Sequence, residues 1–159
     1  MKKIVIDGHN LIPKITGLHL KDADDETRLI ERVQEYCRLE RRSAELFFDG
    51  APDPRGNHSK YGLVHTHFIK IGRSADDAII EYLRSHTKEK DHLLVVSSDH
   101  RIQNEAKGLR FKVLSADDFA REMERAFRCD IAANERKEKP LSTSEVDEWL
   151  QLFENRKNS

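Results

Sequence analysis

The sequence lacks an apolar run of about 18 residues, the length that a membrane-spanning helix needs, so neither a span nor a membrane partner is expected. It has only two cysteines, Cys37 and Cys129, both within helical patterns. Two such thiols are more often buried and reduced than joined in a disulfide. The apolar run after Lys2 and Lys3 is too short to be the apolar core of a signal peptide. These absences favour a cytoplasmic protein.

The sequence also lacks an excess of charge of one sign, with 28 Lys and Arg against 29 Asp and Glu, a net charge of −1. This balance neither supports nor excludes a nucleic-acid partner, because the local distribution of charge decides binding. No internal repeat or low-complexity segment is present. The length of 159 residues is enough for one domain with a real core.

Short apolar runs alternate with helical patterns along the chain. Helices are expected after Asp25, Ser74, Asp99 and Asp117, and residues 51–62, with two prolines and two glycines, are expected to be a loop. Strands that alternate with helices imply parallel βαβ units. The sequence therefore predicts an α/β fold with helices on both faces of a five-stranded parallel sheet, whose strands lie at residues 4–6, 44–48, 63–71, 92–96 and 111–114.

The C-terminal segment differs in composition from the rest. Residues 135–141 are charged and contain a proline, which predicts a linker after a domain at residues 1–134. Residues 142–145 form a helix-capping signal, and an amphipathic helix is expected in the tail, residues 142–159. This helix either docks on its own domain or binds a partner, such as the ribosome or a second copy of the chain in a homodimer. Its apolar stripe consists of Val146, Trp149, Leu150 and Phe153.

Acidic residues recur where the predicted strands end. Asp7, Asp49 and Asp99 follow the first, second and fourth strands, and Asp76 opens the helix after the third. The carboxyl ends of parallel strands lie at one edge of a sheet, and ligands bind just beyond that edge. Converging carboxylates repel one another unless a cation is present. Hard oxygen ligands suit Mg²⁺ or Mn²⁺, so a cation site is predicted there.

Each acid also has a purely structural explanation when it is taken alone. Asp49 before Gly50 suits an ordinary turn, and Asp76, Asp77 and Asp99 suit the first positions of helices. Four acids at one edge together favour the cation site, with Asp49 as the weakest member.

Four motifs resemble the NYN domain family of the YacP-like type, which is related to the PIN-domain ribonucleases. The resemblance covers about residues 1–131, and residues 144–150 are also similar to that subgroup. It implies a PIN-like three-layer fold with the parallel strand order 3-2-1-4-5. It also implies a divalent-metal-dependent endoribonuclease that cleaves RNA phosphodiester bonds with a metal-activated water. The motifs are Ile6–Asn10, Phe48–Gly50, Ser74–Ile79 and Val95–Asp99.

The resemblance implies roles for individual residues as well. Asp7, Asp76 and Asp99 match the metal ligands of the family, and Asn10 matches a polar partner that orients a ligand. These four residues are the predicted catalytic set. PIN relatives often carry a further acid shortly after the last one, where this chain has Arg101, so a full second metal site is not implied. Further candidates for the site are Asp49, Asp77 and Ser98.

A basic stretch precedes the helix that Asp76 opens. Residues 51–75 carry four Lys and Arg against one acid, and such a stretch beside a metal cleft suits a phosphate backbone. Simple solvation of these charges is the alternative. His65 and His67 share one face of a strand, but two histidines at this spacing without a third ligand are a weak sign of zinc. The predicted RNA contacts are Arg55, His58, Lys60, Arg73 and Arg101.

Two other functions fit parts of the pattern. An RNA-binding PIN-like module with weak or no catalysis, acting with the translation machinery, would keep the fold, and Arg101 in place of an acid supports it. Mn²⁺ uptake at Asp7 separates this module from the nuclease. A phosphatase of the haloacid dehalogenase type also begins with a strand-end Asp, but it needs a second Asp where His9 stands.

Overall fold

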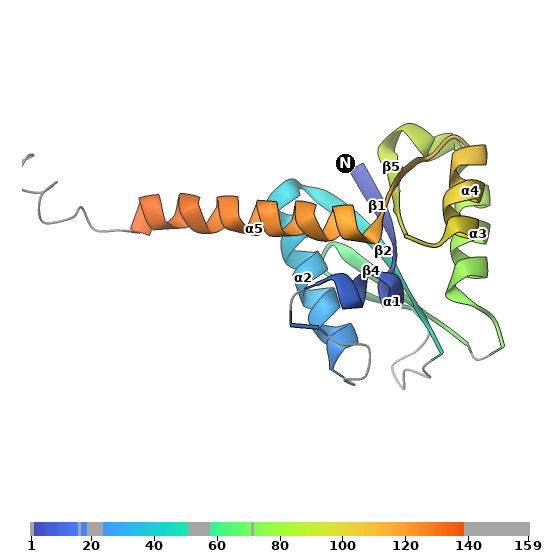
Figure 1. Cartoon of the computed structure of the whole chain (residues 1–159), viewed down its shortest axis with the longest axis horizontal. Coiled ribbons are helices and arrows are strands. Elements are labelled where there is room, and N and C mark those ends of the chain that lie inside the picture. The colour runs from blue at the N-terminus through green and yellow to red at the C-terminus, as the bar shows by residue number, and fades with distance from the viewer. Residues whose placement is uncertain (1, 16, 19–23, 51–57, 71, 139–159) are drawn as a thin grey trace, which may run out of the picture. The chain divides into compact units, whose positions relative to one another are not determined.

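The computed structural model describes residues 2–15, 17–18, 24–50, 58–70 and 72–138, with only the backbone at positions 58, 137 and 138 (Figure 1). The chain divides into two compact units, Met1–Ala126 and Phe127–Ser159. The elements in chain order are β1 (Lys2–Asp7), α1 (Gly8–Leu11), the 3-10 helix η1 (Ile12–Lys14), α2 (Asp25–Glu40), β2 (Arg42–Asp49), β3 (His58–Tyr61), β4 (Val64–Ile69), α3 (Ala75–Ser85), the 3-10 helix η2 (Thr87–His92), β5 (Leu93–Val96), α4 (His100–Gly108), β6 (Lys112–Leu114) and α5 (Ala116–Glu138).

The first unit is built on a six-stranded mixed sheet in the order β3-β4-β2-β1-β5-β6. Five of these strands are parallel, and they are the five predicted from the sequence, in the predicted order 3-2-1-4-5. β1 lies in the centre, with Ile6 paired with Leu46 of β2 and with Val96 of β5. The end of β1 therefore lies beside the end of β5, as the cation-site prediction requires.

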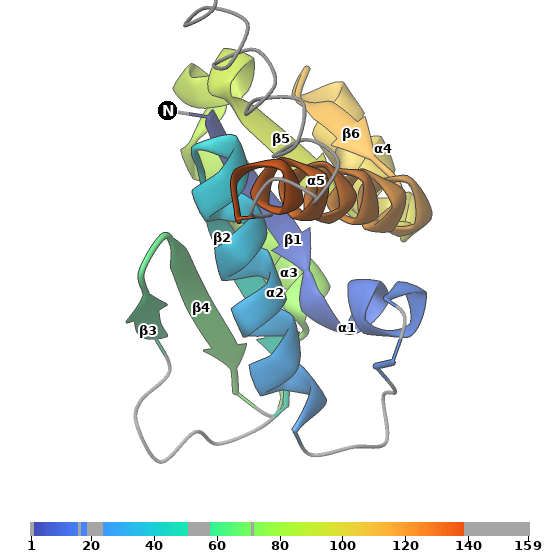
Figure 2. The same cartoon turned by 90° about the vertical axis from the view of Figure 1, so that its left-hand side faces the viewer.

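The sixth strand, β3, corrects the expectation of a loop throughout residues 51–62. β3 pairs antiparallel with β4, with Tyr61 opposite Val64, and forms a hairpin at the sheet edge (Figure 2). The hairpin turns at Gly62, whose φ of 58° suits a glycine, and Leu63. Residues 51–57 lie outside the described part of the chain. A turn of only two residues explains why the sequence pattern did not separate β3 from the loop before it.

Helices cover both faces of the sheet within the first unit (Figure 1). On one face α3 and α4 pack on β1, β2 and β5, with a core that includes Val5, Phe47 and Ile79. On the other face Tyr36 of α2 meets Phe119 of α5, with ring centroids 5.2 Å apart. Side chains alternate between the faces along each strand, so the odd-numbered residues of β1, β2 and β4 point toward α3. This parity places Asp7, Asp49 and the two histidines of β4 on the α3 face.

One local expectation was wrong in part. Of the two cysteines, both free thiols, Cys37 is buried as expected, whereas Cys129 is exposed.

The predicted domain boundaries remain predictions. α5 continues to Glu138, past residue 134, where the sequence places the end of the domain. The predicted tail helix lies outside the described residues. Within the described part of the chain, no helix combines the length and the apolarity that crossing a membrane requires.

Candidate functional site

Four acids lie at the edge of the sheet where the parallel strands end, as the sequence predicts. Asp7 is the last residue of β1 and is 7% exposed, and Asp49 is the exposed last residue of β2. Asp76 lies in the first turn of α3, and Asp99 caps α4 three residues after β5 ends. We call these four residues the acid edge.

The acids of this edge act on one another electrostatically. Burial raises the pKa of Asp7 to about 7, and the charges of Asp76 and Asp49 add to this effect. A hydrogen bond from the Asn10 backbone opposes it. Burial also raises the pKa of Asp76, with further contributions from Asp99 and Asp49. Negative charge at this edge is therefore incompletely compensated, which is the condition that a bound cation relieves.

Hydrogen bonds fix several of these side chains in place. The backbone N–H groups of Arg101 and Ile102 donate to Asp99 Oδ1 at 2.9 and 3.2 Å, so Asp99 is a helix cap as well as a member of the acid edge. The Ala75 N–H donates to Asp49 Oδ1 at 2.5 Å. In the described structure these bonds engage one oxygen of each carboxylate.

Asn10 and Ser98 join the segments that follow β1 and β5. The Ser98 N–H donates to Asn10 Oδ1 at 2.9 Å, which ties α1 to the loop that leads to Asp99. The Ser98 hydroxyl accepts a hydrogen bond from the Ala116 N–H at 3.0 Å. Both residues therefore position the edge, and the structure gives Asn10 a specific partner that the sequence alone did not reveal.

Asp77 and Arg101 form an exposed ion pair beside the acid edge. A hydrogen bond from Arg101 holds the pKa of Asp77 below its usual value. The same guanidinium lies near enough to Asp76 to oppose the rise of its pKa. The side chain at the position of the additional family acid is thus a cation that neutralises a neighbouring acid.

Gly8 lets the chain turn into α1 directly after Asp7. A Cβ on Gly8 would lie 2.3 Å from a ring carbon of Phe48 and 2.9 Å from the Phe47 carbonyl oxygen. Only glycine fits this approach of α1 to β2, so the Asp-Gly pair is a packing requirement here and not a loose turn.

His9 lies close to the acid edge, and the sequence analysis did not include it among the candidate site residues. Its Nε2 lies 2.9 Å from Glu26 Oε1, and this hydrogen bond raises the pKa of His9, an effect to which Asp49 and Asp7 contribute. A protonated His9 places positive charge beside the acids. The one feature of the sequence that could have indicated His9 is its position two residues after Asp7.

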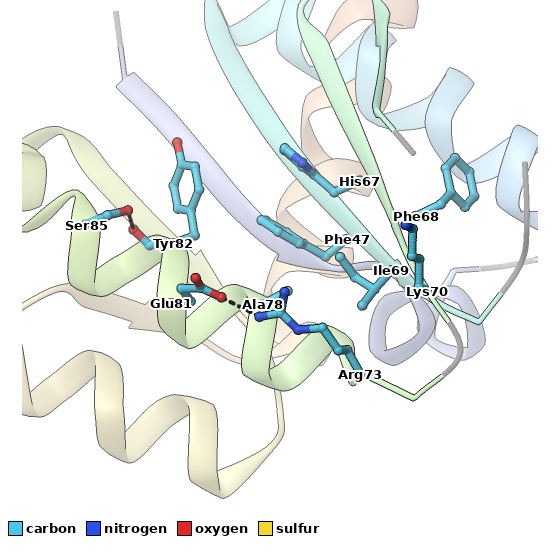
Figure 3. A pocket seen from close by; sticks show the side chains of 10 residues that line it. All are labelled: Phe47, His67, Phe68, Ile69, Lys70, Arg73, Ala78, Glu81, Tyr82 and Ser85. Atoms are coloured by element: carbon cyan, nitrogen blue, oxygen red, sulfur yellow. Dashed lines mark hydrogen bonds and ion pairs between the residues drawn. The ribbon is translucent and has the colours of Figure 1, made fainter. Parts of the chain in front are cut away.

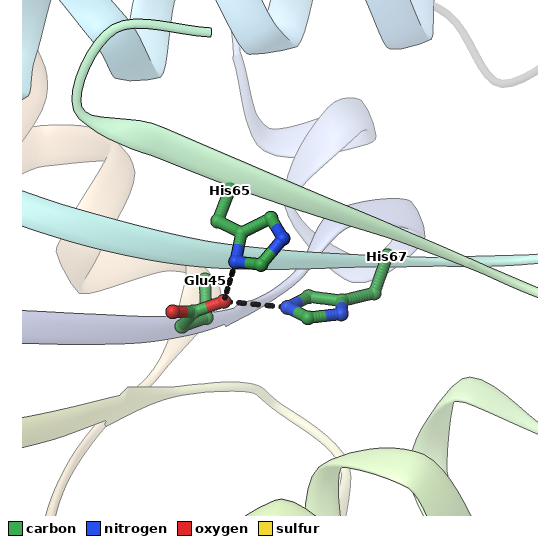
Figure 4. Close-up of side chains that lie close together, drawn as sticks. All are labelled: Glu45, His65 and His67. Carbon is green, nitrogen blue, oxygen red and sulfur yellow. Dashed lines mark hydrogen bonds and ion pairs between the residues drawn. The ribbon is translucent and has the colours of Figure 1, made fainter. Parts of the chain in front are cut away.

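A second cluster lies on the same face of the sheet, further back from the strand ends. Glu45 Oε2 is 2.5 Å from His67 Nε2 and 3.3 Å from His65 Nδ1 (Figure 4). Within the described residues, Glu45, His65 and His67 offer three possible metal-ligand atoms that all lie within 4.8 Å of one another. No three of the described acids of the acid edge meet that spacing. The sequence pattern alone offered no third ligand for the two histidines, whereas in the fold Glu45 lies within reach of both.

A pocket of about 510 Å³ opens between β4 and α3 (Figure 3). His67 stacks on Phe47 at its back, with ring centroids 4.4 Å apart, and Tyr82 faces it from α3. Lys70 and Arg73 line the end near Asp49, whose strand partner Ile69 is also a lining residue. The pocket therefore extends from His67 toward the end of β2 at which Asp49 lies.

The predicted RNA contacts occupy different environments. Arg73 lines the pocket and pairs with Glu81 at 2.5 Å, and Lys60 is exposed on β3. Arg101 is engaged by Asp77. Arg55 lies outside the described residues, as does the side chain of His58.

The comparisons with known proteins agree with this architecture. Residues 4–155 match the model of the YacP-like NYN domain. The chain belongs to this family. A crystal structure of Rae1 (YacP) from Bacillus subtilis is similar with a TM-score of 0.71 and 21% identity, covering 100% of this chain and 96% of that one. A point mutant of the same protein gives 0.68 and 24%, covering 86% and 83%. No curated protein sequence matches the chain.

The donor set at the acid edge of this YacP-like NYN domain fits a divalent cation. Carboxylate oxygens are the ligands of Mg²⁺ and Mn²⁺, and the raised pKa values of Asp7 and Asp76 show that their charges are not balanced.

Proposed function

We propose that this chain is an endoribonuclease that depends on a divalent metal, Mg²⁺ or Mn²⁺, held by Asp7, Asp76 and Asp99. The convergence of these acids at one end of the parallel sheet carries the proposal. The charge of Asp76 raises the pKa of Asp7, and the charge of Asp99 raises the pKa of Asp76. Membership in the YacP-like NYN family supports RNA as the substrate. A bound ion would lower the pKa of a water molecule and offset charge on the scissile phosphate.

The residues of the chain have separate tasks in this proposal. Asp7, with a pKa of about 7 in the metal-free protein, is partly protonated at neutral pH and becomes fully ionised when a cation binds. Asn10 is a positioning residue, since its side chain holds the backbone before Asp99. Arg101 reduces the negative charge near Asp76, which favours one metal over two.

The pocket beside β4 supplies a path for the RNA. Lys70 and Arg73 place positive charge at the end of the pocket that adjoins Asp49. A phosphate backbone that contacts these two residues would lead directly to the acids. The partners proposed for the tail, the ribosome or a second copy of the chain, stay predictions because residues 139–159 are not described.

The test is cleavage of a labelled single-stranded RNA by purified protein with Mn²⁺, Mg²⁺ or a chelator. We expect cleavage with metal, none with chelator, and a loss of at least about 100-fold in Asp7→Asn, since even outer partners of a metal ligand contribute about 10–100-fold. Circular dichroism checks that the variant keeps the fold.

Asp91→Asn is the matched control, because Asp91 is exposed and lies before β5, at the opposite end of that strand. It should cleave like the unaltered protein. Equal cleavage by Asp7→Asn and Asp91→Asn would show that the activity does not come from the acid edge. RNA binding with neither Mn²⁺ uptake at Asp7 nor cleavage would favour the RNA-binding module, which the Arg101–Asp77 pair also suits.

A further inference from the structure

The cluster of Glu45, His65 and His67 is built from two neighbouring strands. Glu45 of β2 is the direct register partner of His65 on β4, and His67 follows two residues later on the same face. The strands fix the backbone of all three positions, so the cluster does not depend on a loop. Their ligand atoms already lie within 4.8 Å of one another.

The donor set differs in kind from that of the acid edge. Two imidazole nitrogens and one carboxylate oxygen are a ligand set of zinc sites that keep an open position, whereas Mg²⁺ prefers oxygen alone. Ligands at zinc distances in a tetrahedral site lie about 3.3 Å apart. The 3.3 Å between His65 Nδ1 and Glu45 Oε2 matches that spacing. The 2.5 Å contact from His67 Nε2 would have to lengthen by about 0.8 Å to reach the same spacing.

The surroundings suit a three-ligand site with one open side. The side chain of His65 is 42% exposed, while those of Glu45 and His67 are each 11% exposed. Both histidines approach Oε2 of Glu45, and Lys3 Nζ lies 3.7 Å from the other oxygen, Oε1. Lys3 can therefore orient the carboxylate from outside, as outer partners of metal ligands do.

We propose that Glu45, His65 and His67 form a binding site for one transition-metal ion of the zinc class, with its open coordination position on the side of His65. This site is separate from the acid edge and independent of cleavage. The bound ion would join β2 to β4 and fix His67, the ring at the back of the pocket.

The test is titration of metal-stripped, full-length protein with Zn²⁺ against a coloured chelator, and with Co²⁺, whose visible spectrum reports tetrahedral coordination. We expect one tight site per chain and a tetrahedral cobalt spectrum. His65→Gln should weaken this site by at least about 10-fold, since outer partners alone contribute about 10–100-fold. His65 is the side chain of choice because its partial exposure makes the substitution tolerable; Glu45→Gln is the second variant.

His92→Gln is the matched control, because His92 is exposed in η2, outside the cluster. It should bind Zn²⁺ like the unaltered protein, and Asp7→Asn should do so as well. Loss of tight binding in His65→Gln and Glu45→Gln alone supports the site. No tight uptake, or the same uptake in His65→Gln as in His92→Gln, would overturn it. Asp7→Asn separates the two proposals, because it should abolish RNA cleavage and leave zinc binding unchanged.

Discussion

Asp7 and Glu45 are two buried acids on the same face of one sheet, 7% and 8% exposed, yet their pKa values move in opposite directions. Burial raises the pKa of Asp7, and the neighbouring acids raise it further. Burial acts in the same sense on Glu45, but the hydrogen bond from His67 and the charges of His67, His65 and Lys3 outweigh it. Burial is therefore the main cause of the raised pKa of Asp7, whereas the neighbours of Glu45 reverse the effect of its burial.

This difference separates two kinds of site. Glu45 has its countercharges within the chain, so its cluster is stable without a ligand and offers nitrogen donors to a softer metal. The acid edge lacks enough countercharge among the described residues, and its donors are hard oxygens. The imbalance of charge at the acid edge is the basis on which we propose a divalent cation there.

The largest expected effect distinguishes two adjacent acids of α3. Asp76 feels the charges of Asp99 and Asp49, whereas Asp77 is paired with Arg101. Asp76→Asn should lower Mn²⁺-dependent RNA cleavage by at least about 100-fold, because it removes a proposed metal ligand. Asp77→Asn should lower cleavage far less, because Asp77 is exposed and its carboxylate is already paired with Arg101. Equal losses of cleavage in both variants would mean that cleavage depends on the first turn of α3 in general and not on the carboxylate of Asp76.

The next effect is on stability. The folded pKa of Asp7, about 7, lies above its ordinary value of 3.8, so the folded state holds a proton that the unfolded chain releases. Metal-free stability should therefore fall as pH rises from about 4 to 7. Asp7→Asn should be more stable than the unaltered protein at pH 8, by about 1–3 kcal/mol, and not at pH 4.

Urea unfolding of chelator-treated protein at both pH values measures this effect. Mn²⁺ should stabilise the unaltered protein at pH 8 and leave Asp7→Asn nearly unchanged. If Asp7→Asn were less stable than the unaltered protein at pH 8, the charge of Asp7 would be compensated in the fold.

Glu45→Gln should show the opposite sign. The folded pKa of Glu45 is lowered, so its contribution is present above the unfolded pKa near 4.5 and is lost as pH falls through the folded pKa. The variant should lose about 1–3 kcal/mol at pH 7, since it leaves partners of a buried carboxylate unsatisfied. The same urea experiment measures this loss, and a variant as stable as the unaltered protein would contradict it.

The smallest effect concerns Arg101. The ion pair with Asp77 is exposed, so Arg101→Gln should not measurably change stability. It should raise the pKa of Asp76 further, because the guanidinium opposes the rise of that pKa in the unaltered protein. The pH at which Mn²⁺ binding is half complete should therefore move upward. If Mn²⁺ titration showed no shift in that pH, the charge of Arg101 would have no influence on the acid edge.

Much of the fold followed from the sequence because local patterns specify it. Short apolar runs located all five parallel strands, and the resemblance to the NYN family supplied their order. β3 was missed because its four residues follow a proline- and glycine-rich stretch and join β4 through a two-residue turn. A strand this short is specified by its partner strand and not by its own periodicity.

The candidate site was predictable in part. Asp7, Asp76 and Asp99 were placed at one edge because strand ends and helix starts coincide there. Glu45 was not identified, since an acid within an apolar strand becomes informative only when the register puts it opposite His65. The partners of Asn10 and Arg101 were also hidden, because hydrogen bonds and ion pairs between distant segments require the tertiary structure.

The most direct test of the metal site is a crystal structure of the protein soaked in Mn²⁺, with anomalous scattering used to locate the ion. The prediction is a manganese peak at the acid edge, with oxygen atoms of Asp7, Asp76 and Asp99 at ligand distance. A structure with no manganese at these acids, or with manganese only between Glu45, His65 and His67, would contradict it.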